Sequence, residues 1–181
     1  MNLSEKDVNR FYHIWLTLLD CTNEKYKIVP KIEDLAHSTS IIAEDISPIR
    51  DRLWQDDSII EDVIVSNSPQ FSDADLSIVQ SWKNRVTNKF ILLKHLKNYS
   101  VFLSDNHIYG VNGLVSPLEE IFPSFALPLM IQTTLLPFEG KIIYDSLLMT
   151  YPISFGGGAK KDFLEQYREF KGRSGIVTSL D

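Results

Sequence analysis

Residues 90–103 have the sequence FILLKHLKNYSVFL, and this stretch marks the point where the chain changes its periodicity. It is rich in β-branched and aromatic residues, and Lys97-Asn98 indicates a reversal between two strands. Before about residue 87 the apolar residues recur at three-to-four spacing, whereas beyond it they alternate with polar ones. The sequence therefore predicts helices first and a sheet afterwards.

The second half of the chain continues with short strands and closes with a helix. Further strands are predicted over residues 107–114, 129–136 and 141–148. Gly140 supplies the positive φ of a tight hairpin between the last two. A helix follows Gly156–Gly158 and ends near Lys171, and its apolar face consists of Phe163, Tyr167 and Phe170. About five strands with local connections predict an antiparallel meander, curled or barrel-like, that this helix covers.

The first half predicts four helices, which begin near Ser4, Lys31, Ser47 and Ser72. Ser4 and Ser72 are each followed three residues later by an aspartate, which is typical of an N-cap with an acidic first turn. Pro48 is expected at the first helical position after Ser47, where a missing N–H does no harm. The last of these helices carries Leu76, Val79, Trp82 and Val86 on one side. All three tryptophans of the chain fall in this half, where we expect them to anchor helix packing.

The composition is that of an ordinary globular protein. Of the 181 residues, 44% are hydrophobic and 23% are charged, and a chain of this length buries roughly 70% of its unfolded surface on folding. We expect an α+β fold in which a helical region, residues 1–86, packs on an antiparallel sheet with its closing helix, residues 87–181. The two regions are expected to form one continuous structural unit.

Charge and cysteine content indicate the compartment and the partner. The first 86 residues carry 9 Lys and Arg against 15 Asp and Glu, which accounts for the whole net charge of −6. Such a half repels phosphate backbones, so the expected partner is a protein or a small molecule and not nucleic acid. A single cysteine, Cys21, and the lack of an apolar run of membrane-spanning length predict a cytoplasmic protein without a membrane partner. The sequence leaves the oligomeric state open.

Four segments carry a resemblance to a known family: KFILLKHLKNYSVFLS (89–104), YGVNGL (109–114), TTLLPFEGKIIYD (133–145) and SFGGG (154–158) before a helix. In this order they resemble a family of uncharacterised bacterial proteins, mainly across residues 82–170. The resemblance implies a shared fold and a bacterial source, but no activity, cofactor or catalytic residue. A related member has Gly after the Tyr-Asp pair, where this chain has Ser146.

The glycines Gly156, Gly157 and Gly158 form the first candidate site. They precede a helix, where free backbone N–H groups and the positive end of the dipole can hold an anion, and Lys160 and Lys161 add positive charge. The stretch lacks both the Walker pattern and the GxGxxG fingerprint. A structural hinge between the last strand and the helix is the alternative that we favour.

A carboxylate at the end of a strand is the second candidate. Asp145 ends the hairpin strand and is a weak candidate for a catalytic base, with Tyr99, Tyr109 or Tyr151 expected near it.

Other titratable residues give little indication of a site. Glu119 and Glu120 are adjacent and point in different directions, so we expect a solvated loop or cap rather than a proton-sharing pair. The four histidines lack metal-ligand spacing, and only His95 and His107 could approach each other. Neither a metal site nor a cofactor is predicted.

Three functions are compatible with these features. A noncatalytic binding or interaction module is favoured, because no acid–base set is visible and the sheet region is rich in tyrosine. The second is an enzyme or sensor that binds a phosphorylated small molecule at Gly156–Gly158, with Asp145 as the base. The third is a helix-turn-helix regulator over residues 28–54, and the aspartates of its recognition helix argue against it.

Overall fold

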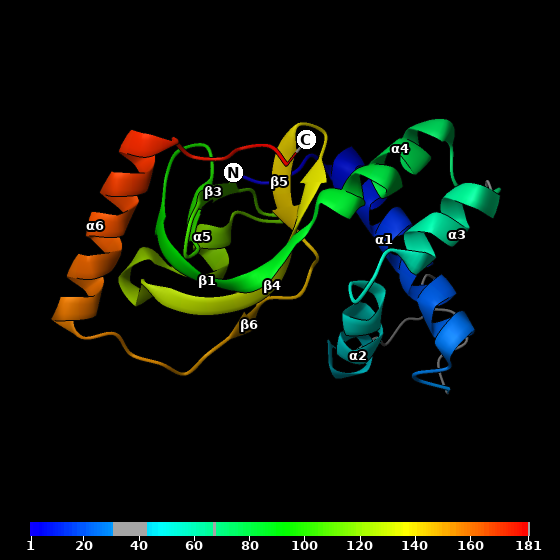
Figure 1. Cartoon of the computed structure of the whole chain (residues 1–181), viewed down its shortest axis with the longest axis horizontal. Coiled ribbons are helices and arrows are strands. Elements are labelled where there is room, and N and C mark those ends of the chain that lie inside the picture. The colour runs from blue at the N-terminus through cyan, green and yellow to red at the C-terminus, as the bar shows by residue number, and fades with distance from the viewer. Residues whose placement is uncertain (31–42, 67, 181) are drawn as a thin grey trace. The chain divides into compact units, whose positions relative to one another are not determined.

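The computed structural model describes residues 1–30, 43–66 and 68–180 and divides into two compact units (Figure 1). The helical unit comprises Glu5–Lys83, and the sheet unit comprises Met1–Ser4 with Asn84–Asp181. Helices thus come first, followed by a sheet and a final helix, which confirms the α+β prediction. The packing of the helical half on the sheet, as one continuous unit, stays a prediction.

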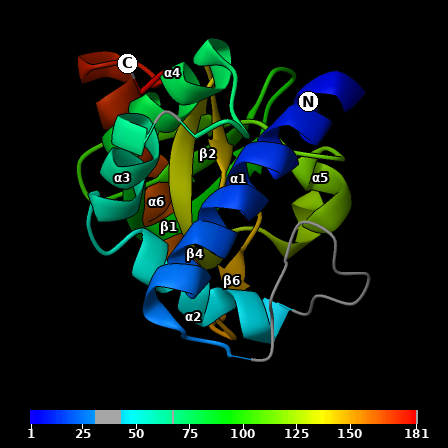
Figure 2. The same ribbon diagram turned by 90° about the vertical axis from the view of Figure 1, so that its right-hand side faces the viewer.

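The described part of the helical unit contains α1 (Glu5–Tyr26), α2 (Ala43–Leu53), α3 (Ser58–Ser66) and α4 (Asp73–Ser81), followed by the 3-10 turn η1 (Trp82–Asn84). Helix α1 lies against α2 and α3 (Figure 2). Trp15, Trp54 and Trp82 are all buried, which confirms their predicted packing role. The ring of Phe11 joins two of them, with its centroid 6.1 Å from that of Trp15 and 6.0 Å from that of Trp82.

The predicted cap at the start of α4 is present. The backbone N–H of Asp75 donates to Oγ of Ser72 at 3.2 Å, and the backbone N–H of Ser72 donates to Oδ2 of Asp75 at 3.0 Å. This reciprocal pair is a capping box. Nε of Arg10 also donates to Oδ1 of Asp75 at 2.7 Å, so the same carboxylate ties α4 to α1.

Several helix predictions were wrong in detail. Helix α2 begins at Ala43, so Pro48 lies inside the helix and not at its first position, because Ala43, Glu44 and Asp45 already form an acidic first turn. Helix α3 was missed because its sequence, SIIEDVIVS, is rich in β-branched residues that disfavour helix on propensity. Val86 begins a strand instead of ending a helix. The helix predicted from Lys31 lies outside the described residues up to position 42.

The sheet unit contains β1 (Val86–His95), β2 (Ser100–Leu103), β3 (Ile108–Val111), β4 (Leu129–Phe138), β5 (Lys141–Tyr144) and β6 (Met149–Thr150). A helix α5 (Leu118–Ile121) and a 3-10 turn η2 (Ser124–Ala126) lie between β3 and β4. The final helix α6 (Gly157–Arg173) follows β6.

The strands are connected differently from the expected meander. The pairs β1–β2, β2–β3, β3–β5, β5–β4 and β4–β1 form a closed cycle, and β6 adds to β4. The long connection through α5 and η2 returns β4 to the side of β1, which is a Greek-key arrangement. It also makes β5 parallel to β3, whereas all other pairs of strands are antiparallel. Local patterns could not show this, because long-range connections decide it.

The hairpin between β4 and β5 agrees with its prediction. Glu139 has φ 49° and Gly140 has φ 70°, and these two residues join a register in which Phe138 faces Lys141. Positive φ at both central residues is the mark of a type I′ turn, which matches the twist of paired strands.

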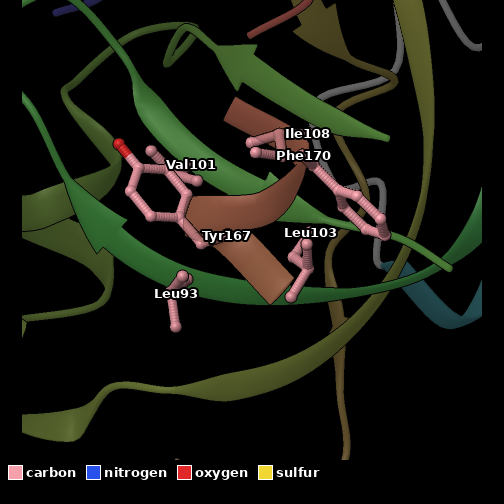
Figure 3. Packing of buried hydrophobic residues seen from close by; sticks show 6 residues of the cluster. All are labelled: Leu93, Val101, Leu103, Ile108, Tyr167 and Phe170. Carbon is pink, nitrogen blue, oxygen red and sulfur yellow. The ribbon is translucent and has the colours of Figure 1, made fainter. Parts of the chain in front are cut away.

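Helix α6 and the tail behind it close one side of the sheet unit. Tyr167 and Phe170 pack against a cluster on β1, β2 and β3, made of Leu93, Val101, Leu103 and Ile108 (Figure 3). Beyond α6, Val177 pairs with Tyr109 on β3, through Gly110 N to Val177 O and Val177 N to Ile108 O, both at 2.8 Å. The tail therefore docks on the sheet.

Candidate functional site

The glycine-rich start of α6 is exposed. Gly156 is the N-cap, with φ −68° and no side-chain cap bond, and Gly157 and Gly158 lie in the first turn. None of the three has a positive φ, so the backbone does not require glycine at these positions. Lys160 and Lys161 are also exposed, and Nζ of Lys161 lies 3.7 Å from Oε1 of Glu165. These residues share one solvent-facing helix end.

Asp145 is fully buried just beyond β5. Its backbone N–H donates to the carbonyl of Thr134 at 3.0 Å, and Oγ1 of Thr133 lies 3.2 Å from its Oδ1. The same hydroxyl donates to the carbonyl of Leu147 at 2.7 Å. A base must reach the proton that it removes, and a carboxylate enclosed in this way presents nothing to a molecule bound from solvent.

The three tyrosines expected near Asp145 have other surroundings. The ring of Tyr99 covers Gly110, where an added Cβ would lie 2.8 Å from it. Tyr109 is buried against Phe90, with ring centroids 5.9 Å apart. The hydroxyl of Tyr151 donates to Oε1 of Gln132. Each tyrosine thus has a structural contact of its own.

His95 forms a clasp at the end of β1. Its Nδ1 lies 2.7 Å from Oγ of Ser100 on β2, and its Nε2 lies 2.8 Å from the carbonyl oxygen of Phe122. Because a carbonyl only accepts, Nε2 carries a proton and the ring orientation is fixed. His107 directly precedes β3, whose first residue, Ile108, pairs with Leu103 at the other end of β2. The two histidines are therefore not brought together.

The segment held by this clasp presents apolar side chains to solvent. Ile121 is 46% exposed at the end of α5, and Phe125 is 91% exposed in η2. Leu118, which is buried, anchors α5. Glu119 and Glu120 are exposed and precede Ile121 in α5, and Glu119 accepts a hydrogen bond from Oγ of Ser124 at 3.0 Å. We call Glu119, Glu120, Ile121 and Phe125 the α5–η2 surface.

A depression of about 400 Å³ lies between α1 and α3 in the helical unit, lined among others by Cys21, Glu24, Lys25, Asp62 and Val63. Burial raises the pKa of the Cys21 thiol, and the carboxylates of Asp20 and Glu24 raise it further. Nζ of Lys25 forms an ion pair with Asp62 at 2.7 Å. Less of the nucleophilic thiolate is therefore present at neutral pH than for a free cysteine.

The arginines on α2 have partners within the helical unit. Nε of Arg50 lies 3.0 Å from Oδ1 of Asp51, and Arg52 pairs with Asp56 at 2.9 Å. Arg52 also lies over the ring of Tyr26, 3.8 Å from its centroid. These two cations, the ones available to a helix-turn-helix on α2, are thus already engaged.

The described residues also limit the class of site. No three of their His, Cys, Asp and Glu side chains are grouped so that they could hold a metal ion. None of the helices in the described ranges is both long and apolar enough to cross a bilayer.

Comparison with known proteins adds no assignment: no family model matches the chain, and neither curated proteins nor solved structures give a match. The evidence for the α5–η2 surface as a candidate site is therefore structural alone.

Sequence reasoning missed both this surface and its clasp. Periodicity predicts which residues of a regular element are buried, but Phe125 lies in a loop bracketed by prolines, where no period applies. The available indication was a phenylalanine between Pro123 and Pro128 without a strand or helix to bury it. Nothing in the sequence joins His95 to Phe122, because the contact depends on how the chain returns after β3.

Proposed function

We propose that this protein is a noncatalytic interaction module that binds another protein through the α5–η2 surface. The observation that carries the proposal is the 91% exposure of Phe125. Burial of a phenylalanine side chain is worth about 1.5–3 kcal/mol, so an exposed one that a partner covers contributes directly to binding. Aromatic side chains dominate protein–protein contact energies, particularly when they enter a pocket of the partner.

The surroundings of Phe125 support a partner that is itself a protein. The side chain projects from a short turn, so a complementary pocket would have to come from the partner. Glu119 and Glu120 are exposed on α5, and Glu119 accepts a hydrogen bond from Ser124, the residue before Phe125, which favours a positively charged rim around that pocket. The clasp of His95 on Phe122 supports a preorganised surface, which lowers the entropic cost of binding.

The surroundings of three titratable side chains support a noncatalytic role. Asp145 is sealed from solvent, both ring nitrogens of His95 have partners, and the pKa of Cys21 is raised. None of these three groups offers a free base or nucleophile. The single cysteine supports a reducing compartment, so the proposal places the protein in the cytoplasm.

The proposal is tested by affinity capture with a matched pair of variants. Full-length protein, the Phe125→Ser variant and the Val65→Ser variant are each immobilised and exposed to a lysate of the source cells. Val65 is 86% exposed on α3, so its variant loses a similar apolar side chain at another place. We expect a protein enriched at least tenfold by the wild type and by Val65→Ser and lost with Phe125→Ser. The same enriched proteins on all three baits would overturn the proposal.

A second candidate is the binding of a phosphorylated small molecule at the start of α6. Its support is that the first turn holds no acidic residue, while Lys160 and Lys161 lie close by, so the positive end of the helix is not compensated. Inorganic phosphate and a nucleotide panel test it by thermal shift, since a ligand of the native state must raise Tm. An unchanged Tm at millimolar ligand concentration would remove this candidate.

A further inference from the structure

Helix α6 carries a strip of basic side chains on its exposed side. Lys160, Leu164, Arg168 and Lys171 follow one another at spacings of four, four and three residues, so they lie along one face of the helix. All four are exposed, and the apolar side chain of Leu164 is 40% exposed. We call these four residues the α6 strip. It combines positive charge with an apolar contact.

The acidic residues of α6 form a separate strip, which consists of Asp162, Glu165 and Glu169. Nζ of Lys161 lies 3.7 Å from Oε1 of Glu165, so the charge of Lys161 is partly offset within the helix. Lys160 and Arg168, in contrast, form no ion pair with any residue in the part of the chain that the structure describes. The positive charge of the α6 strip is therefore available to a partner.

The α5–η2 surface has the same combination with the opposite charge. Glu119 and Glu120 are exposed, and neither has an ion-pair partner among residues 1–30, 43–66 and 68–180. Ile121 and Phe125 supply the apolar contact. The proposed function calls for a partner with positive charge around an apolar contact, and the α6 strip of this same chain has both.

The two surfaces of one chain do not meet each other. Helices α5 and α6 lie apart within the sheet unit (Figure 2). A contact between them must therefore join two copies of the chain, in a heterologous arrangement that either closes into a small oligomer or continues from copy to copy.

We propose that the partner of the α5–η2 surface is a second copy of this chain, which binds through its α6 strip. In this contact Phe125 packs on Leu164 and on the aliphatic part of Arg168, while the two glutamates of α5 face the cations of the strip. Exposed ion pairs add little affinity, so the phenylalanine supplies most of the binding and the charges select the surface that it meets. This inference rests on the proposed function and names its partner.

Light scattering on the purified full-length protein tests the self-association. We expect the average mass to rise above that of one chain as the concentration reaches the high micromolar range. Phe125→Ser should stay at the mass of one chain, because it loses the apolar contact. A wild-type protein that remains monomeric over the same range would overturn the inference.

Exchange of charge across the contact tests which surfaces meet. One variant carries Glu119→Lys and Glu120→Lys, and the other carries Lys160→Glu and Arg168→Glu. Each variant alone brings like charges together and should be monomeric. In an equimolar mixture every contact between the two variants pairs opposite charges, so association should return. A mixture that stays monomeric would overturn the assignment of the α6 strip.

A matched control excludes an effect of net charge. Glu165→Lys with Glu169→Lys changes the net charge by the same amount as the variant on α5, but on the acidic strip of α6, which the contact does not use. We expect this control to associate as the wild type does. Loss of association in the control would contradict a contact made by the α6 strip, because the acidic strip would then be part of the interface.

The results also separate this inference from the proposed function. A monomeric wild type that still captures a protein from lysate through Phe125 would overturn the second copy as partner and leave the proposed function standing. Self-association that neither Phe125→Ser nor the variant on α5 weakens would overturn the inference, because a different surface would then join the copies.

Discussion

The Nε2 atom of His95 lies 2.8 Å from the carbonyl oxygen of Phe122, so a side chain on β1 holds the segment that carries the α5–η2 surface. Replacement of His95 by Ala leaves that carbonyl without its donor. We expect a loss of about 1–2 kcal/mol in the free energy of unfolding, from one hydrogen bond and the unpaired group. Urea denaturation measures it. His107→Ala is the control, because His107 is exposed and its loss should change stability by less than about 0.5 kcal/mol.

The two histidine variants also differ in local dynamics. His95→Ala should speed amide exchange in α5 and η2, whereas His107→Ala should leave it unchanged. Equal stability and equal exchange in both variants would show that the clasp does not hold the surface.

Asp75 makes the helical unit sensitive to acid. Burial alone would raise the pKa of this carboxyl, but hydrogen bonds from Ser72 and Arg10 outweigh it and hold the pKa below its usual value. Ionised Asp75 therefore stabilises the fold above the pKa of an unfolded aspartate, about 4, and this stability is lost as pH falls through the lower folded pKa. Asp75→Asn should lower the free energy of unfolding by about 1 kcal/mol at pH 7. The difference in Tm between this variant and the wild type should shrink towards pH 3. A difference that stays constant with pH would contradict this account.

Two glycines should respond to alanine with opposite signs. Gly140 has φ 70°, which an alanine side chain disfavours, so Gly140→Ala should destabilise the protein by about 1 kcal/mol. Gly158 lies in α6 with nothing within 4 Å of an added Cβ, so Gly158→Ala should stabilise α6 by up to about 1 kcal/mol. Both changes are measured by urea denaturation. A destabilised Gly158→Ala would show that the start of α6 needs glycine.

Cys21 should be a slow nucleophile. Its pKa is raised first by burial and then by Asp20 and Glu24, so less thiolate is present at neutral pH than for a free cysteine. Alkylation by the uncharged reagent iodoacetamide at pH 8 should be several-fold slower than that of glutathione. Glu24→Gln should raise the rate by removing one negative charge. A rate equal to that of glutathione would contradict the raised pKa.

The sequence was informative where the deciding contacts are local. The cap at Ser72 with Asp75, the hairpin at Gly140 and the apolar face of α6 with Tyr167 and Phe170 all depend on neighbouring residues, and all were predicted. The parallel pair β3–β5 was missed, since no local pattern says which strand returns beside which.

The candidate site was harder to predict than the fold. Asp145 was placed at a strand end, as the structure confirms, but its full burial depends on surrounding strands. The exposure of Phe125 is likewise set by the tertiary path of a loop. The sequence shows which chemical groups a side chain carries. Whether that side chain is exposed depends on which distant segments of the chain pack around it.

The most direct measurement for the binding proposal is photo-crosslinking at the residue on which it rests. A benzoylphenylalanine is placed at position 125 of the full-length chain, and in a matched control at position 65, and both proteins are irradiated in living cells. We predict a discrete crosslinked protein species with the probe at position 125 that is absent with the probe at position 65. No adduct at position 125, or the same adducts at both positions, would contradict the assignment of the α5–η2 surface as a binding site.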